Sequence, residues 1–337
     1  MPSFPGQFPT TRLRRLRQHP VLREMLQMAS ITVNDLICPI FVTHGQNSKQ
    51  PIESMPGQYR WSIDLLPQLL EELVALDIRS IMLFGLPQNK DPLGEDSYSD
   101  NGIMQQAIRV VKQQAPSLYV TTDICFCEYT DHGHCGALTD EIGRVDVHND
   151  TTLELLQKQA LSHAQAGADM LVPSGMMDGV VQALRHTLDN HGFSHIPIMS
   201  HSIKYASVLY SAFREAVDCS LSKGGDRKSY QADHLHDAAQ ALREVALDLQ
   251  EGTDMVVVKP IMHYLDIVQQ IKQQFPGVPI VGYHVSTEYM MYKLTAKTGL
   301  VDEQRLVFEL LNSIKRAGCD LIVTYYAQEV AKWLKNK

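Results

Sequence analysis

Short apolar runs alternate with longer amphipathic stretches along most of the chain. Between the runs, apolar residues recur at helical spacing, as in 65–77, 152–168, 237–252 and 303–318. Several helical stretches end in a Gly-containing step, AGAD, EGTD or AGCD, just before the next run. The runs are rich in β-branched residues and are typical of buried strands; they cover 36–42, 80–86, 118–124, 169–175, 196–202, 254–260, 278–285 and 320–326.

This alternation predicts an α/β fold. Eight strands separated by helices favour parallel pairing, and eight is the number that closes a (β/α)8 TIM barrel. A doubly wound open sheet is the alternative, but no strand candidate is followed by the G-x-G-x-x-G motif of dinucleotide-binding sheets. We predict a catalytic barrel over 30–337, preceded by an extended N-terminal arm over 1–29.

Composition and charge narrow the function classes. The 337 residues are 44% hydrophobic and 20% charged, which is ordinary for a globular domain with a sizeable core. A net charge of −8 argues against a nucleic-acid surface, so we interpret the basic run over 12–17 as a solvated arm or a subunit contact. No apolar run has the length of a membrane span or the pattern of a signal peptide, and we expect a soluble, cytoplasmic protein without a membrane partner.

Polar and ionisable residues follow the predicted strands. Active sites of (β/α)8 barrels lie at the carboxyl ends of the strands, so residues at those ends are expected to share one mouth. The residues in question are Asp123 with the cysteines that follow it, Ser174, Lys204, Lys259, Ser286 and Tyr325.

Three of the six cysteines fall in the segment CFCEYTDHGHCG, as Cys125, Cys127 and Cys135. In a reducing compartment such a cluster favours a metal or catalytic site over disulfides. Three thiolates suit zinc and leave a fourth position open, as a catalytic zinc requires. His132 and His134 are competing ligand candidates, and a redox pair or three ordinary buried thiols remain alternatives.

Two lysines stand at strand ends. Lys259 closes the apolar run DMVVVKP, and Lys204 follows the fifth strand candidate. Burial and a second nearby cation both depress the pKa of a lysine, and a neutral amine can form a Schiff base with a ketone. The alternative is that each lysine snorkels to solvent or pairs with a carboxylate such as Asp123.

The long segment between the fifth and sixth strands concentrates basic side chains. Residues 204–231 hold Arg214, Lys223, Arg227 and Lys228 together with several aromatic residues. Arginine binds carboxylates through a planar two-pronged fork, so this segment fits a mobile lid over an anionic substrate. A solvated basic loop is the simpler alternative.

Several ordered motifs together resemble the porphobilinogen synthase (5-aminolevulinate dehydratase) family over nearly the whole chain. The resemblance weakens after GDRKSYQ, where 232–240 read ADHLHDAAQ. The motifs are LICPIFV, ESMPGQYRWSID, DICFCEYTDHGHCG, VPSGMMDG, IMSHSIKYAS, AFREA, GDRKSYQ, VVKP with YLDIV, GYHVSTEYMM and SIKRAGCDLIVTYYA.

The resemblance implies a lyase that condenses two molecules of 5-aminolevulinate to porphobilinogen early in tetrapyrrole (heme) synthesis. It also implies a homo-octamer held by the N-terminal arm. Lys259 would form the Schiff base with the propionate-side substrate and Lys204 with the acetate-side substrate. Carboxylates would be held by Arg214, Arg227 and Gln231, and by Ser286 and Tyr325; Tyr210, Phe213 and Tyr283 would line the pocket, with Asp123 and Ser174 beside the lysines.

The same resemblance implies the metal sites. Cys125, Cys127 and Cys135 match the ligands of a catalytic zinc in the zinc-using branch of the family, and Glu244 in LREV matches a ligand of an allosteric magnesium in some relatives. A Schiff-base aldolase would need one lysine and no cysteine loop, and an inactive zinc-storage barrel would be expected to lack a catalytic lysine. The sequence therefore favours the synthase over both.

Overall fold

The computed structural model describes residues 6–28, 30–223 and 225–336. The predicted eight-stranded barrel is confirmed: parallel strands follow one another in the order β8-β5-β4-β1-β12-β11-β10-β9. A bridge between Leu171 and Ile198 brings β8 beside β9 and closes the ring. The strands are β1 (Leu36–Thr43), β4 (Ser80–Leu86), β5 (Tyr119–Ile124), β8 (Met170–Pro173), β9 (Met199–Lys204), β10 (Met255–Lys259), β11 (Ile280–His284) and β12 (Leu321–Thr324).

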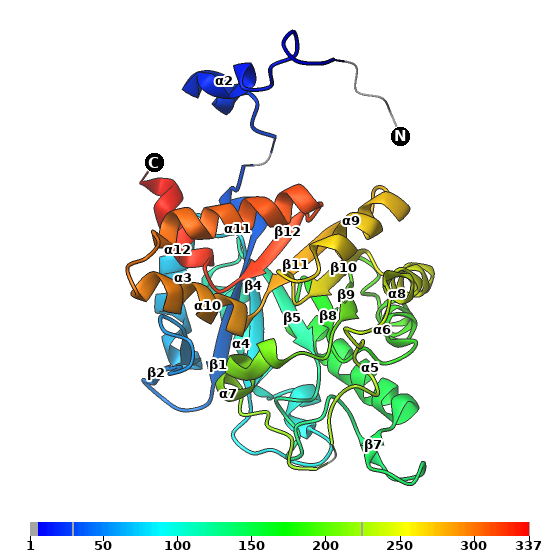
Figure 1. Ribbon diagram of the computed structural model, residues 1–337. Helices are drawn as coiled ribbons and strands as arrows, with labels where there is room; N and C mark the ends of the chain where they lie inside the picture. Colours follow the sequence, from blue (N-terminus) through cyan, green and yellow to red (C-terminus); the bar gives the residue numbers. More distant parts are fainter. Residues whose placement is uncertain (1–5, 29, 224, 337) are drawn as a thin grey trace.

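Helices surround the barrel and cover the outer faces of the strands (Figure 1). Because both faces of each strand are then buried, the strands read as nearly continuous apolar runs. The helices are α3 (Leu66–Ala75), α4 (Ile103–Gln114), α5 (Asn149–Ala166), α6 (Val180–Asn190), α7 (Ser211–Ala216), α8 (Ala238–Glu251), α9 (Leu265–Gln274), α10 (Ser286–Lys297), α11 (Glu303–Ala317) and α12 (Ala327–Lys335).

The AGAD, EGTD and AGCD steps join helix ends to strand starts. Their glycines end α5, α8 and α11 with φ values of 107°, 103° and 127°, a region that favours glycine. The following aspartates each accept a backbone N–H at the start of a neighbouring strand segment: Asp169 from Val120, Asp254 from Ile198 and Asp320 from Ile280, at 2.7, 2.8 and 2.9 Å. The steps therefore fix strand register as well as helix ends.

The remaining elements lie outside the ring. Short strands β2 (Lys49–Pro51) and β3 (Tyr59–Ser62) pair with each other, and β3 also extends β1. The other elements are β6 (Leu138–Thr139), β7 (Asp146–Val147), and the short helices η1 (Val33–Asp35), η2 (Ile63–Leu65), η3 (Glu95–Tyr98) and η4 (Val208–Tyr210).

The predicted arm contains α1 (Arg15–Gln18) and α2 (Pro20–Met25), whose residues are almost all exposed, and it projects from the barrel end opposite α7 (Figure 1). Residues 1–5 and 29 of the predicted arm lie outside the described residues. In the part of the chain that the structure describes, no helix is both long and apolar enough to cross a membrane.

Candidate active site

Two lysines occupy the carboxyl ends of adjacent barrel strands. Lys204 ends β9 and Lys259 ends β10, and their Cα atoms are register partners in the parallel ladder. The sequence placed Lys204 beyond the fifth strand, whereas that strand runs two residues further than predicted and ends at Lys204. The polar residues 200–202 are buried within the strand, so they do not mark its end. Both lysines are only 6% exposed.

Lys259 lies in an aromatic environment. Its Nζ is 3.9 Å from the ring centroid of Tyr283 and 5.5 Å from those of Tyr210 and Phe213. Burial, and secondarily repulsion by the charge of Lys204, lower the pKa of Lys259 to about 8. A much larger fraction of this amine is therefore neutral near pH 7 than in an ordinary lysine.

Lys204 has a more polar environment. Its Nζ donates a hydrogen bond of 2.6 Å to the backbone oxygen of Ser174. Burial opposes its charge, but thiolates of the cysteine loop and the Asp123 carboxylate outweigh burial and raise its pKa. Burial also raises the pKa of Asp123, against the attraction of both lysines and a hydrogen bond with Ser174. The two amines thus have opposite pKa shifts on adjacent strand ends.

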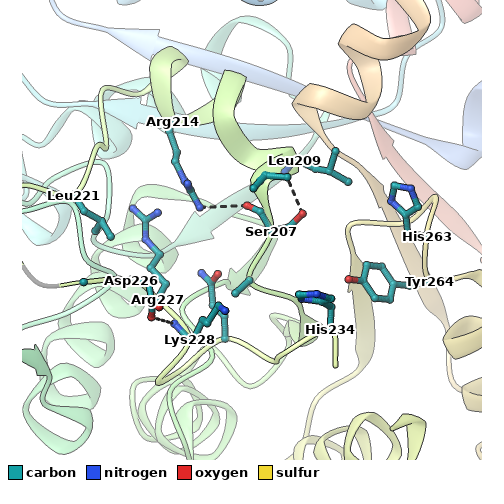
Figure 2. A pocket seen from close by; sticks show the side chains of 14 residues that line it. Ser207, Leu209, Arg214, Leu221, Asp226, Arg227, Lys228, His234, His263 and Tyr264 are labelled. Atoms are coloured by element: carbon teal, nitrogen blue, oxygen red, sulfur yellow. Dashed lines mark hydrogen bonds between the residues drawn. The ribbon is translucent and has the colours of Figure 1, made fainter. Parts of the chain in front are cut away.

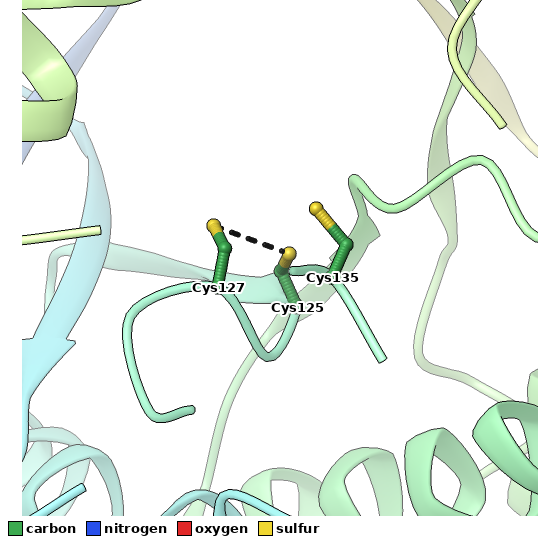
Figure 3. A group of neighbouring side chains, drawn as sticks. All are labelled: Cys125, Cys127 and Cys135. Atoms are coloured by element: carbon green, nitrogen blue, oxygen red, sulfur yellow. Dashed lines mark hydrogen bonds between the residues drawn. The ribbon is translucent and has the colours of Figure 1, made fainter. Parts of the chain in front are cut away.

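The cysteine loop follows β5 and lies beside Lys204. The sulfur atoms of Cys125, Cys127 and Cys135 are within 4.8 Å of one another, and all three side chains are buried. They project to the same side of the loop, and the Cys125 thiol donates to Cys127 at 3.6 Å (Figure 3). Hydrogen bonds from Cys125 and Cys127 lower the pKa of Cys135. Three converging sulfur donors fit a borderline-soft divalent cation such as zinc.

The two histidines of the loop face other partners. The His132 ring contacts the Pro92 oxygen at 3.2 Å through Nε2, and its Nδ1 accepts the backbone N–H of His134 at 3.1 Å. The His134 ring contacts the Tyr230 hydroxyl at 3.0 Å and the Lys223 oxygen at 2.7 Å. Neither imidazole joins the three-sulfur group, so their candidacy as ligands is not supported.

Two buried residues at this site were missed by the sequence reasoning. Glu128 is 2% exposed, its Oε2 accepts from the Cys127 thiol at 3.3 Å, and burial raises its pKa to about 8. Cys219, in the segment after α7, is also 2% exposed and interacts with the Cys127 thiol. Glu128 lies within the cysteine motif, next to Cys127, and was detectable there, whereas no local pattern connects Cys219 to that motif.

The predicted lid forms one side of a cavity of about 730 Å³ (Figure 2). Arg214, Arg227 and Gln231, the residues expected to hold one carboxylate, all line it. The Nε–H groups of both arginines are buried and lack a hydrogen-bond partner among the described residues. Neither Lys204 nor Lys259 lines this cavity, and both side chains are buried.

The other predicted substrate-binding residues meet near Lys259. The Ser286 hydroxyl, at the start of α10, accepts the backbone N–H of Phe213 at 2.9 Å. The Tyr325 ring stacks on Phe41 with centroids 6.1 Å apart, and its hydroxyl interacts with that of Tyr283. Residues from β11, α7 and α10, and Tyr325 just after β12, therefore meet on the Lys259 side.

Glu244 lies apart from this mouth. It lines a separate cavity of about 370 Å³ between α6 and α8, together with Asp178, Asp248 and Glu251. Burial, followed by repulsion from Asp248 and Asp178, raises the pKa of Glu244. This second cavity is lined by oxygen donors, unlike the sulfur-rich loop.

A closed parallel barrel with ionisable groups at the carboxyl ends of its strands is the architecture of a (β/α)8-barrel enzyme, here a lyase. Residues 10–333 match the family model described as "Delta-aminolevulinic acid dehydratase". The chain belongs to this family.

Relatives from distant organisms match the chain along its length. A Delta-aminolevulinic acid dehydratase from Synechocystis sp. is 50% identical over 331 residues, covering 98% of this chain and 100% of that protein. The Archaeoglobus fulgidus protein of the same name is 46% identical over 330 residues, with the same coverage. A crystal structure of the Toxoplasma gondii enzyme, described as porphobilinogen synthase in complex with its reaction product porphobilinogen, matches with a TM-score of 0.93. It is 38% identical and covers 97% of this chain and 92% of that one.

Proposed function

We propose that this protein is a porphobilinogen synthase, which condenses two molecules of 5-aminolevulinate to porphobilinogen with loss of two waters. This is an early step of tetrapyrrole synthesis. The observation that carries the proposal is the pairing of Lys204 with Lys259 at the ends of adjacent strands, directly beside the cysteine loop. An aldolase would need only one such amine.

The paired amines tether both substrates. The neutral Nζ of Lys259 attacks the ketone carbon of the propionate-side substrate, a C–N bond forms, and the carbonyl oxygen leaves as water. Lys204 reacts in the same way with the acetate-side substrate. The tethered molecules are then joined through one C–C and one C–N bond, and the amines are released when the ring closes. Two reactions between separate molecules thereby become reactions between oriented partners.

Positively charged and hydroxyl groups would hold the two substrate carboxylates. Arg214 and Arg227 offer unpartnered Nε–H groups to the cavity beside Gln231, which suits one carboxylate. Ser286 and Tyr325 offer hydroxyls on the Lys259 side for the other. Tyr210, Phe213 and Tyr283 surround the Lys259 amine and exclude water from it, which keeps its pKa low.

Asp123 and Ser174 would handle protons. The Asp123 carboxyl is buried and interacts with both lysines, and its raised pKa lets it hold a proton more readily than an exposed aspartate. Ser174 hydrogen-bonds Asp123 through its side chain and Lys204 through its backbone oxygen. This arrangement orients the Lys204 amine and gives Asp123 a route for proton exchange with it.

Two metal sites complete the proposal. Cys125, Cys127 and Cys135 would hold zinc, which when bound supplies a Lewis acid and positive charge beside the acetate-side substrate. Glu244 would bind magnesium in the second cavity, where Asp178, Asp248 and Glu251 add oxygen ligands or bind its water shell. The 6–28 segment, with exposed Leu13, Leu16 and Met25, would pack on a neighbouring subunit of a homo-octamer.

Borohydride trapping with 5-aminolevulinate, followed by peptide mass mapping, tests the mechanism. Adducts are expected at both Lys204 and Lys259 in the wild-type enzyme, and at one site only in Lys204→Met and Lys259→Met. Pyrrole formation, detected with an aldehyde colour reagent, is expected in the wild type alone. An adduct at only one lysine in the wild type, with no pyrrole, would instead indicate aldolase-like chemistry.

A further inference from the structure

A fourth buried thiol lies against the three-cysteine group. Cys219 follows α7 in the lid segment, far along the chain from the cysteine loop. Its side chain is 2% exposed, and its thiol interacts with that of Cys127. The remaining cysteines of the chain, Cys38 and Cys319, are buried elsewhere in the barrel. Cys219 is not one of the three sulfurs that lie within 4.8 Å of one another, so it lies at the edge of that group, on the side of Cys127.

The chain after α7 is held in position by cations. Arg60 donates to the Ala216 oxygen at 2.6 Å, and Lys90 donates to the Val217 oxygen at 3.1 Å. Asp218 adopts a left-handed conformation with φ of 51°, which turns the chain just before Cys219. These hydrogen bonds, from β3 and from the loop after β4, hold the segment that carries Cys219 against the cysteine loop when the lid is in the position seen here.

The lid backbone also packs tightly on the cysteine loop. Arg227 donates to the Gly133 oxygen at 2.6 Å and to the Cys219 oxygen at 3.0 Å, and so joins the two segments. A Cβ atom at Gly133 would lie 2.5 Å from the Ser220 oxygen and 3.0 Å from the Cys219 oxygen. This approach requires glycine between Cys127 and Cys135, and it places Cys219 over the sulfur group.

The surroundings suit a negatively charged cluster. Four thiolates around a divalent cation carry a net charge of two minus, which is costly to bury without nearby cations. Arg227 is 6% exposed, approaches the Cys219 sulfur at 4.0 Å and leaves its Nε–H without a partner among the described residues. The Lys204 ammonium and the Arg214 guanidinium also interact with these thiols. Cationic side chains from three segments thus surround the sulfur group.

We propose that Cys219 is a lid-borne fourth ligand of the metal ion held by Cys125, Cys127 and Cys135. The inference rests on the proposed metal site. With the lid closed and no substrate present, the cation has four thiolate ligands, and the four thiol protons are released to solvent. Substrate replaces Cys219 at the fourth position. The Cys219 thiolate that leaves the metal then takes up a proton from solvent. Ligand exchange at the metal is thereby linked to lid movement, and the idle enzyme resembles a closed structural zinc site.

Cobalt(II) reports the number of thiolate ligands, because the intensity of sulfur-to-metal charge-transfer absorption follows the number of metal–sulfur bonds. The Cys219→Ser enzyme loaded with Co²⁺ is expected to lose about a quarter of the wild-type intensity, the share of one thiolate in four. Adding 5-aminolevulinate should lower the wild-type intensity to that of the variant and leave the variant unchanged. Cys319→Ser, which alters a buried thiol remote from the loop, should match the wild type.

If the wild type and Cys219→Ser have equal charge-transfer intensity and Cys125→Ser has a lower one, Cys219 is not a ligand. The three-cysteine site would then stand without it. Absence of charge-transfer absorption from the wild type would overturn the metal site itself, together with this inference. Cadmium-113 NMR of the wild type needs no variant: a four-sulfur chemical shift that moves upfield with 5-aminolevulinate supports Cys219, and a shift typical of three sulfurs and one oxygen contradicts it.

Discussion

The repulsion between the two active-site amines can be measured directly. Neighbouring parallel strands lie about 4.8 Å apart. The Nζ of Lys204 donates to the Ser174 oxygen, and that of Lys259 lies over the ring of Tyr283. At about 6 Å and an effective dielectric constant of about 20, two unit charges repel by about 2.8 kcal/mol, or about two pH units in a titration. Asp123 interacts with both lysines and reduces this value, so we expect about one to two pH units.

The change is Lys204→Met, and the assay is the pH dependence of cyanoborohydride trapping of 5-aminolevulinate at Lys259. Only the neutral amine attacks, so trapping by the wild type should rise with pH through a midpoint of about 8. About a tenth of Lys259 is then neutral at pH 7, compared with about one part in 3,000 for an ordinary lysine. Removing the Lys204 charge raises the pKa of Lys259, and the midpoint should move upward by the expected one to two pH units.

Lys204→Arg is the matched control, because it keeps the positive charge but removes the amine that forms a Schiff base. Its midpoint should stay near that of the wild type. The reasoning is refuted if Lys204→Met keeps the wild-type midpoint, or if Lys204→Arg moves it as far as Lys204→Met does. Burial is the larger cause of the low pKa, so even Lys204→Met should retain a midpoint below that of an exposed lysine.

Three further predictions concern other parts of the molecule. Gly133→Ala should abolish pyrrole formation, because the added Cβ would meet the lid backbone. Gly143→Ala is the control: Gly143 also has a positive φ but open space around it, so this variant should remain active. Equal loss of activity in both variants would contradict the packing argument. Burial raises the pKa of Glu288 to about 7, so the proton stabilises the folded state fully below about pH 4.5, and this stabilisation is lost as pH rises through 7. Relative to Glu288→Gln, the wild-type free energy of unfolding in urea should fall by about 3 kcal/mol from pH 4.5 to 8, and parallel pH profiles would argue against the shift. Chelation should abolish pyrrole formation, with recovery on adding zinc, yet leave trapping at Lys259, whose amine is activated mainly by burial.

The local sequence was sufficient to predict the barrel and the position of Lys259 at the end of its strand. The apolar run ending at Lys259 is buried on both faces, so its composition marks both the strand and its end. The run before Lys204 was harder to delimit. The predicted run, 196–202, already included the polar but buried residues 200–202, yet the strand begins three residues later and ends two residues later, at Lys204.

Contacts between segments that are far apart in the chain could not be predicted from short sequence motifs. Spacing placed His132 and His134 beside three cysteines, but their ring nitrogens are directed toward Pro92, Lys223 and Tyr230 on other segments. Cys219 reaches the sulfur group only because side chains from separate barrel loops hold the end of α7. Such positions depend on the assembled barrel, and no short motif encodes them.

The seam of the barrel bears on how the protein folds during synthesis. β1 pairs with β12, and an ion pair of 2.7 Å between Asp35 and Lys315 lies beside this junction. A ribosome therefore makes nearly the whole chain before the first strand can gain its final neighbour. Until then one edge of β1 is open to pairing with other nascent chains, a known route to aggregation. Closure of the ring, and with it assembly of the paired amines, must await the last strand to be translated.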